Sequence, residues 1–244
     1  MTVSRTTRRG LAWTVAFLLG VAAPARAANL EFLPILIEFP TGPATKTLEV
    51  RNRGEGTVAI QVRAFAWSQT PTSDEMAPTS DLTVSPPIFH LAGGETQVIR
   101  LLLRARPSDT ERAYRIVVDE IPQPGAGGVV RMALRVSLPA FAAPSGAAVP
   151  QLLWRVEREG GQMQIVATNA GRKRSRVDEL TVSLLGGRRI VPRLTGQLPY
   201  VLPGAERRWL LEGAGHSSIP GGPLRVSARI DAGPLENVVS VTRR

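Results

Sequence analysis

Residues 129–138 read Val-Val-Arg-Met-Ala-Leu-Arg-Val-Ser-Leu, and this alternation of side chains is typical of a β-strand. One face carries an apolar row of Val130, Met132, Leu134, Val136 and Leu138. Residues 123–128 contain three glycines, and we expect them to form a flexible hairpin connection before the strand. Two interpretations of the row stay open. It can fill the core of its own sandwich, or it can lie on an edge strand that is offered to another protein's sheet.

Similar runs occur on both sides of this stretch, and each is bounded by Gly, Pro or Asn. We expect strands at 47–50, 58–67, 96–103, 114–118, 152–156, 162–167, 180–185, 207–211, 224–230 and 238–241. No segment sustains a helical apolar stripe beyond three turns. The pattern therefore predicts an all-β protein built from β-sandwiches.

The chain divides at residues 142–150, Ala-Ala-Pro-Ser-Gly-Ala-Ala-Val-Pro, which are small and uncharged. We expect one domain at 28–144 and a second at 145–244. A faint echo links the two halves, since each has a strand that ends in Asn-x-Gly, at Asn52 and at Asn169. Two related sandwich domains are the simplest interpretation.

Residues 1–27 have the pattern of an export signal. A basic segment is followed by the apolar residues 11–23 and by Ala25-Arg26-Ala27, which suits a signal peptidase. Thirteen apolar residues are too few to span a bilayer, which needs about 20. We expect cleavage after Ala27 and an exported protein without stable membrane insertion.

The composition argues against several function classes. The formal net charge is +10, and it falls to +6 without residues 1–27, which hold four arginines and no acid. A dedicated nucleic-acid binder is expected to show longer basic runs. With no cysteine and only two histidines, no metal centre or cofactor is predicted. No nucleophile–base motif is present, and Asp119-Glu120 is a poor catalytic pair because neighbours on a strand face opposite ways. We expect a protein that is not an enzyme.

Several sequence blocks carry a resemblance to a known family. They are Pro34 with its apolar run, Asn52-x-Gly54, Gln61-Val-Arg-x-Phe65-x-Trp67, Ser85-Pro-Pro-Ile-Phe89, Gly94 with Gln97-Val-Ile-Arg100, Tyr114-Arg115, Glu120-Ile-Pro122, and Leu138-Pro-Ala-Phe141 with Pro144. In order and spacing they resemble the periplasmic chaperones of chaperone–usher pilus assembly. The pattern is similar to the archaic branch, whose members accompany spore-coat-U-like pilins. The second half matches more loosely, through Asn169-x-Gly171 and Tyr200-Val-Leu-Pro-Gly204.

The resemblance implies two immunoglobulin-like domains in a boomerang arrangement, in the periplasm. The strand at about 129–141 would complete a pilin or coat-like subunit that lacks its last strand, with Val130, Met132, Leu134 and Val136 facing the subunit. The chaperone would consume no nucleotide and would deliver the subunit to an outer-membrane usher. When free, it could also cap its own edge by self-association.

The sequence departs from the better-known branch, which holds the subunit's C-terminal carboxylate with two basic residues. The matching positions here are Leu36 and Pro139, and neither is basic. Arg115 is the first candidate for the carboxylate anchor, and Arg100 and Arg135 are weaker ones. The alternative for Arg115 is an ordinary ion pair with a nearby carboxylate. The alternative for the whole chain is an exported β-sandwich structural or adhesin subunit. A secreted hydrolase with an immunoglobulin-like accessory domain is a third alternative, and the missing catalytic constellation argues against it.

Overall fold

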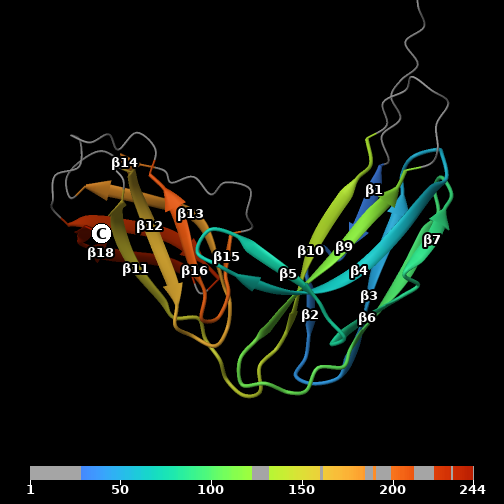
Figure 1. Cartoon of the computed structure of the whole chain (residues 1–244), viewed down its shortest axis with the longest axis horizontal. Helices are drawn as coiled ribbons and strands as arrows, with labels where there is room; N and C mark the ends of the chain where they lie inside the picture. The colour runs from blue at the N-terminus through green and yellow to red at the C-terminus, as the bar shows by residue number, and fades with distance from the viewer. Residues whose placement is uncertain are drawn as a thin grey trace, which may run out of the picture.

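Two β-sandwiches joined at an angle make up the computed structural model (Figure 1). The structure describes residues 29–122, 132–159, 162–184, 189–190, 199–211, 223–231 and 233–243. Every regular element in these ranges is a β-strand, which confirms the all-β prediction. These ranges contain no helix of the length and apolar character needed to cross a membrane. Residues 1–28, including the expected cleavage site, lie outside the described residues.

The N-terminal sandwich consists of two sheets. One sheet has the order β1 (Leu30–Leu33), β3 (Ala44–Asn52), β8 (Thr96–Leu103), β6 (Leu82–Ser85). The other has the order β2 (Ile37–Phe39), β10 (Arg135–Ala142), β9 (Arg112–Ile121), β4 (Val58–Gln69), β5 (Asp74–Pro78), with β7 (Ile88–Leu91) also on β4. The chain crosses from the first sheet to the second between β1 and β2, so these two short strands close one edge of each sheet.

The C-terminal sandwich repeats the two-sheet plan. One sheet has the order β16 (Glu206–Leu210), β12 (Gln162–Asn169), β11 (Leu152–Glu159), β19 (Val241–Arg243). The other has the order β14 (Arg189–Ile190), β13 (Ser175–Leu184), β17 (Leu224–Ile230), β18 (Gly233–Val239), with β15 (Tyr200–Val201) also on β13.

Each sandwich has its own apolar core, because alternate side chains of each strand point inward. Ile60, Ile99 and Leu101 are fully buried in the first core, and Ile165, Val182 and Val226 are fully buried in the second. At about 25 cal/mol per Å² of apolar surface removed from water, these separate cores are the main stabilising contribution in each half.

The Asn-x-Gly echo corresponds to one hydrogen-bond motif that occurs in both sandwiches. The Asn52 side-chain amide donates to the carbonyls of Gly56 (2.7 Å) and Leu91 (3.1 Å), and its oxygen accepts from the Gly54 N–H (2.9 Å). Asn169 does the same with the carbonyls of Lys173 (2.8 Å) and Val201 (3.0 Å) and with the Gly171 N–H (3.0 Å). Both side chains are buried. The equivalence supports the prediction of two related domains.

An apolar and aromatic junction joins the two sandwiches. Trp67 and Phe141 of the first pack against Tyr200 of the second, with ring centroids 5.4–6.1 Å apart. Arg174 of the second sandwich donates to the Glu111 carboxylate of the first (2.7 Å) and stacks 3.7 Å above the Phe141 ring. Burial raises the pKa of Glu111, against the lowering effect of Arg174. The junction therefore combines packed rings with a buried ion pair, and it holds the two sandwiches together.

Candidate functional site

Strand β10 has an unpaired edge along its first half. It pairs with β9 over its whole length, from Arg135 to Ala142. On its other side β2 pairs only with Ala140–Ala142. Within the described residues, the stretch from Arg135 to Pro139 therefore has a neighbouring strand on one side only, and an open edge of this kind can accept a strand from another chain.

The hydrogen bonds at both ends of β10 show which backbone groups point to that edge. The Glu120 N–H donates to the Leu134 carbonyl (2.9 Å), and the Ala143 N–H donates to the Phe39 carbonyl of β2 (3.0 Å). Since the pattern repeats every second residue, the backbone groups of Arg135 and Ser137 point to the open edge. Pro139 also points there but has no N–H to offer, and an unpaired edge is one of the few places in a sheet that tolerate proline.

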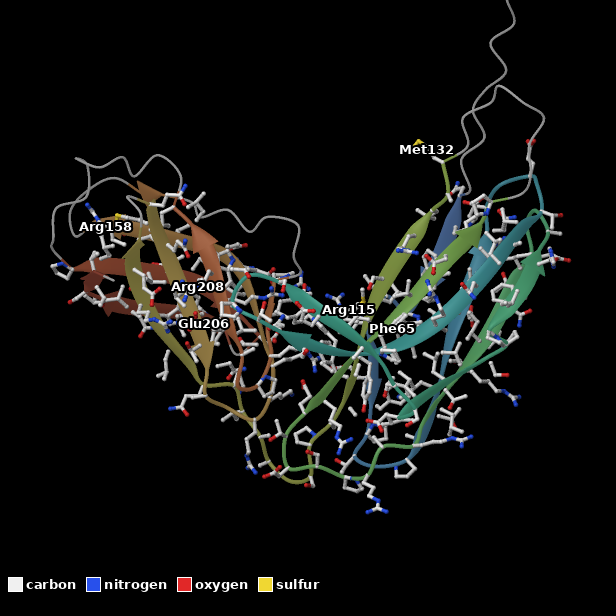
Figure 2. All side chains as sticks on the ribbon, viewed as in Figure 1. Phe65, Arg115, Met132, Arg158, Glu206 and Arg208 are labelled. Carbon is white, nitrogen blue, oxygen red and sulfur yellow. The ribbon has the colours of Figure 1, made fainter. Side chains whose placement is uncertain are left out.

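The burial of the predicted apolar row decreases from Leu138 towards Met132. Leu138 is buried in the N-terminal core, and Val136 is half-buried against it. Leu134 is half-buried, and Met132 is 84% exposed at the far end of the sandwich (Figure 2). Val130 lies outside the described residues. The regular strand begins at Arg135, so part of the row belongs to the sandwich itself and part extends beyond its core.

Arg115 lies on β9, level with Phe65 of β4 and Pro139 of β10. Figure 2 shows Arg115 and Phe65 near the inner angle of the molecule, where the two sandwiches meet. The Arg115 side chain is 6% exposed, and its guanidinium carbon is 3.7 Å from the centre of the Trp67 ring. Its nearest carboxylate is Asp74, at 3.6 Å, which is too long for a hydrogen bond. No acceptor among the described residues receives a hydrogen bond from this guanidinium.

Arg115 is consequently a buried cation that is paired loosely with Asp74 and stacked on Trp67. Burial lowers its pKa to about 10, against the raising effect of Asp74, and the Arg207 charge lowers it further. Three other donors share the Asp74 Oδ1: the Trp67 Nε1 (2.8 Å), the Gln69 Nε2 (3.2 Å) and the Arg207 guanidinium (2.5 Å), while the Asp74 Oδ2 is the atom that faces Arg115. A desolvated guanidinium without a bound acceptor favours the binding of an anion, since a buried charge is stable only when it is paired.

The other two candidate arginines are in different surroundings. Arg100 is exposed on β8, in the sheet that does not contain Arg115, and alternation along β8 turns it away from the core. Arg135 starts β10, and its guanidinium is bonded to the Asp119 carboxylate. The structure therefore does not bring Arg100, Arg115 and Arg135 together. Arg115 is the one of the three that combines burial with open hydrogen-bonding capacity.

The residues that surround Arg115 come from separate strands and are not evident from the sequence. Asp74 lies on the short strand β5, and Arg207 lies on β16 of the second sandwich, fully buried. The only sequence signal was an alternation of Glu206-Arg-Arg-Trp-Leu210, which places Arg207 on the same face as Trp209. In the described part of the chain, no group of three or more His, Asp or Glu side chains could hold a metal ion.

Residues 30–148 match the family model of the pili and flagellar-assembly chaperone, PapD N-terminal domain. No curated protein matches the sequence. One similar structure is the CsuC–CsuE chaperone–tip adhesion subunit pre-assembly complex from archaic chaperone–usher Csu pili of Acinetobacter baumannii. Its identity is 22%, its TM-score is 0.64, and the alignment covers 89% of this chain and 100% of the matched chain.

A second similar structure is the Salmonella enterica SafA pilin in complex with the SafB chaperone. Its identity is 19% and its TM-score 0.61, with 87% of this chain and 97% of the matched chain covered. A third is the Escherichia coli chaperone DraB, with 18% identity, a TM-score of 0.55, and coverage of 90% and 98%. These likenesses confirm the predicted fold of two immunoglobulin-like sandwiches.

Proposed function

The chain belongs, through residues 30–148, to the family of pili and flagellar-assembly chaperones, and from this premise we propose that it binds and stabilises an exported pilus subunit by donating a strand. Its family and fold are those of non-enzymatic pilus chaperones. The observation that carries the proposal is the open edge of β10 from Arg135 to Pro139, with an exposed Met132 leading into it.

The donated strand would act in two ways. A subunit that lacks its last strand has unpaired backbone groups, which are costly when buried. The backbone of Arg135 and Ser137 would form hydrogen bonds with these groups. The side chains of Val130, Met132 and Leu134 would cover the subunit's apolar groove. Val136 contributes less to the subunit, because it packs against the chaperone's own core.

Arg115 would hold the subunit's C-terminal carboxylate. Its guanidinium has two parallel N–H donors for a carboxylate and no hydrogen-bonded partner among the described residues. Asp74 would stay bonded to Arg207 and Trp67. The incoming carboxylate would then bind the Arg115 guanidinium, which Asp74 approaches only to 3.6 Å. This arrangement differs from an anchor made by basic residues at positions 36 and 139, which are Leu and Pro here.

The setting of this activity would be the periplasm, with cleavage of the export signal after Ala27, and the complex would pass the subunit to an outer-membrane usher. The similarity to the archaic Csu assembly supports placement in the archaic branch. The partner would be a spore-coat-U-like or related pilus subunit.

The test is co-expression of the chain with such a subunit, followed by co-purification. Arg115→Ala should lower the affinity for the subunit by about 1.5–3 kcal/mol, the scale of a hydrogen bond to a charged group, with little loss of chaperone stability. Arg100→Ala is the matched control, because it removes an exposed arginine from the other sheet. Equal subunit recovery with all three proteins would remove Arg115 from the site. Failure of the wild-type chain to recover any subunit would contradict the chaperone function.

A further inference from the structure

Two adjacent acidic residues near the end of β9, Asp119 and Glu120, have no part in the proposed function so far. Neighbouring side chains on a strand point to opposite faces of the sheet. Both nevertheless make contacts with the start of the donor strand. The Asp119 carboxylate is bonded to the Arg135 guanidinium, and Glu120 is bonded to the backbone of Leu134.

Asp119 connects three strands. Its second oxygen accepts a hydrogen bond from Arg63 of β4 at 2.6 Å, while the first accepts from Arg135 of β10. The Asp119 side chain is 12% exposed and the Arg135 side chain is 70% exposed. Burial alone would raise the pKa of Asp119, but the hydrogen bonds from Arg63 and Arg135 outweigh it, and the pKa lies below its usual value. The carboxylate is therefore ionised, and it pairs with both arginines, at neutral pH.

Glu120 holds the backbone one residue earlier. Its carboxylate accepts a hydrogen bond from the Leu134 N–H (3.2 Å), and its own N–H donates to the Leu134 carbonyl (2.9 Å). Leu134 directly precedes the first residue of β10. Both backbone groups of Leu134 are thus bonded to a single residue of β9.

The position of these contacts matters because, in the part of the chain that the structure describes, the first half of β10 pairs with β9 alone. A slip of one residue would turn Met132 and Leu134 to the opposite face of the sheet. Pairing with β9 and the buried Leu138 fix the register of the regular strand, but Met132 and Leu134 lie before its first residue. Side-chain contacts made from both faces add a restraint that a slipped strand could not keep.

We propose that Asp119 and Glu120 form a two-sided clamp that fixes the register of the donor strand at Leu134 and Arg135. This inference rests on the proposed function, and it adds the residues that position the strand. The clamp presents the row of Met132 and Leu134 to the subunit in one alignment. Asp119 and Glu120 are positioning residues, since they act through the strand and do not touch the subunit.

The test uses the chaperone purified from the periplasm, with three clamp variants: Asp119→Ala, Glu120→Ala and Glu120→Gln. Hydrogen exchange of the Val136 N–H, measured by NMR, reports the register because this group points to β9. We expect Asp119→Ala and Glu120→Ala each to speed its exchange about tenfold and to weaken subunit binding about tenfold, which corresponds to about 1.4 kcal/mol. Glu120→Gln keeps a side-chain acceptor for the Leu134 N–H and should restore both values.

Glu31→Ala is the matched control, because Glu31 forms an exposed ion pair with Arg53 at 2.7 Å on the other sheet. It should change neither the exchange nor the affinity. If Asp119→Ala does not fold, Arg135→Ala removes the same ion pair from its exposed side and carries the test. Unchanged Val136 exchange and unchanged affinity in Asp119→Ala and Glu120→Ala would overturn the clamp. A Met132→Arg variant separates the two proposals: if it also leaves subunit binding intact, the donor-strand function itself fails.

Discussion

Replacing Met132 by arginine should damage subunit binding and leave the chaperone folded. Met132 is 84% exposed in the free chain, so the change should alter the free energy of unfolding by no more than about 0.5 kcal/mol. Full burial of a methionine side chain is worth about 1.5–3 kcal/mol, and the exposed share of Met132 corresponds to about 1.3–2.5 kcal/mol. Losing that contact should weaken binding roughly 10- to 70-fold, and a charge placed in an apolar groove adds to the loss.

The matched variant is Val136→Arg, which lies four residues after Met132 in the same apolar row. Val136 packs against the N-terminal core, so a charge there should destabilise the chaperone itself and lower its melting temperature by at least about 5 °C. Leu134→Arg lies between the two and should give a folded, exported protein that no longer protects its subunit from degradation. The assay is differential scanning fluorimetry of the free variants together with titration of the subunit. A large drop in melting temperature for Met132→Arg, or unchanged affinity, would refute the idea that this side chain serves a partner.

Three further outcomes follow from the structure. Asn169→Ala should lower the stability of the C-terminal sandwich by about 1–3 kcal/mol in urea denaturation, because it leaves the buried carbonyl of Val201 without its donor and also removes the hydrogen bond to the Lys173 carbonyl; an unchanged midpoint would contradict this. Since the folded pKa of Asp119 is lowered by Arg63 and Arg135, its stabilising contribution is present above about pH 4 and is lost as the pH falls through the folded value. The melting temperature of Asp119→Asn should therefore fall less steeply than that of the wild type between pH 5 and pH 2, and parallel curves would count against it. Arg115→Lys should leave subunit binding about tenfold weaker, because an ammonium group cannot present two parallel donors, whereas full affinity would show that charge alone suffices.

Much of the sandwich architecture could be predicted from alternation and turn residues. The stretch 58–67 and the run 96–103 lie within strands with nearly the expected limits. The short strands β1 and β5 were not predicted, because four or five residues carry too little periodicity to stand out. Their positions depend on tertiary pairing, which a single sequence does not encode locally.

The surroundings of the candidate anchor were harder to predict than its identity. The two-residue block Tyr114-Arg115 points to Arg115, but the carboxylate beside it, Asp74, is shared with Arg207, which comes from the other sandwich. Such a relation between distant residues has no sequence period. The ion-pair alternative for Arg115 agrees with the 3.6 Å approach of Asp74, while the missing hydrogen bond distinguishes it from an ordinary buried pair.

Pro139 determines how long the donated edge can be. A strand that binds along this edge meets backbone N–H groups at Arg135 and Ser137, and at Pro139 it meets only a carbonyl. Immediately beyond, β2 already occupies the edge at Ala140–Ala142. The proline thus limits strand pairing in that direction. A bound strand can form only a few backbone hydrogen bonds along this edge. A short paired edge suits a chaperone that must release its subunit, because a competing strand has few hydrogen bonds to replace before the exchange is complete.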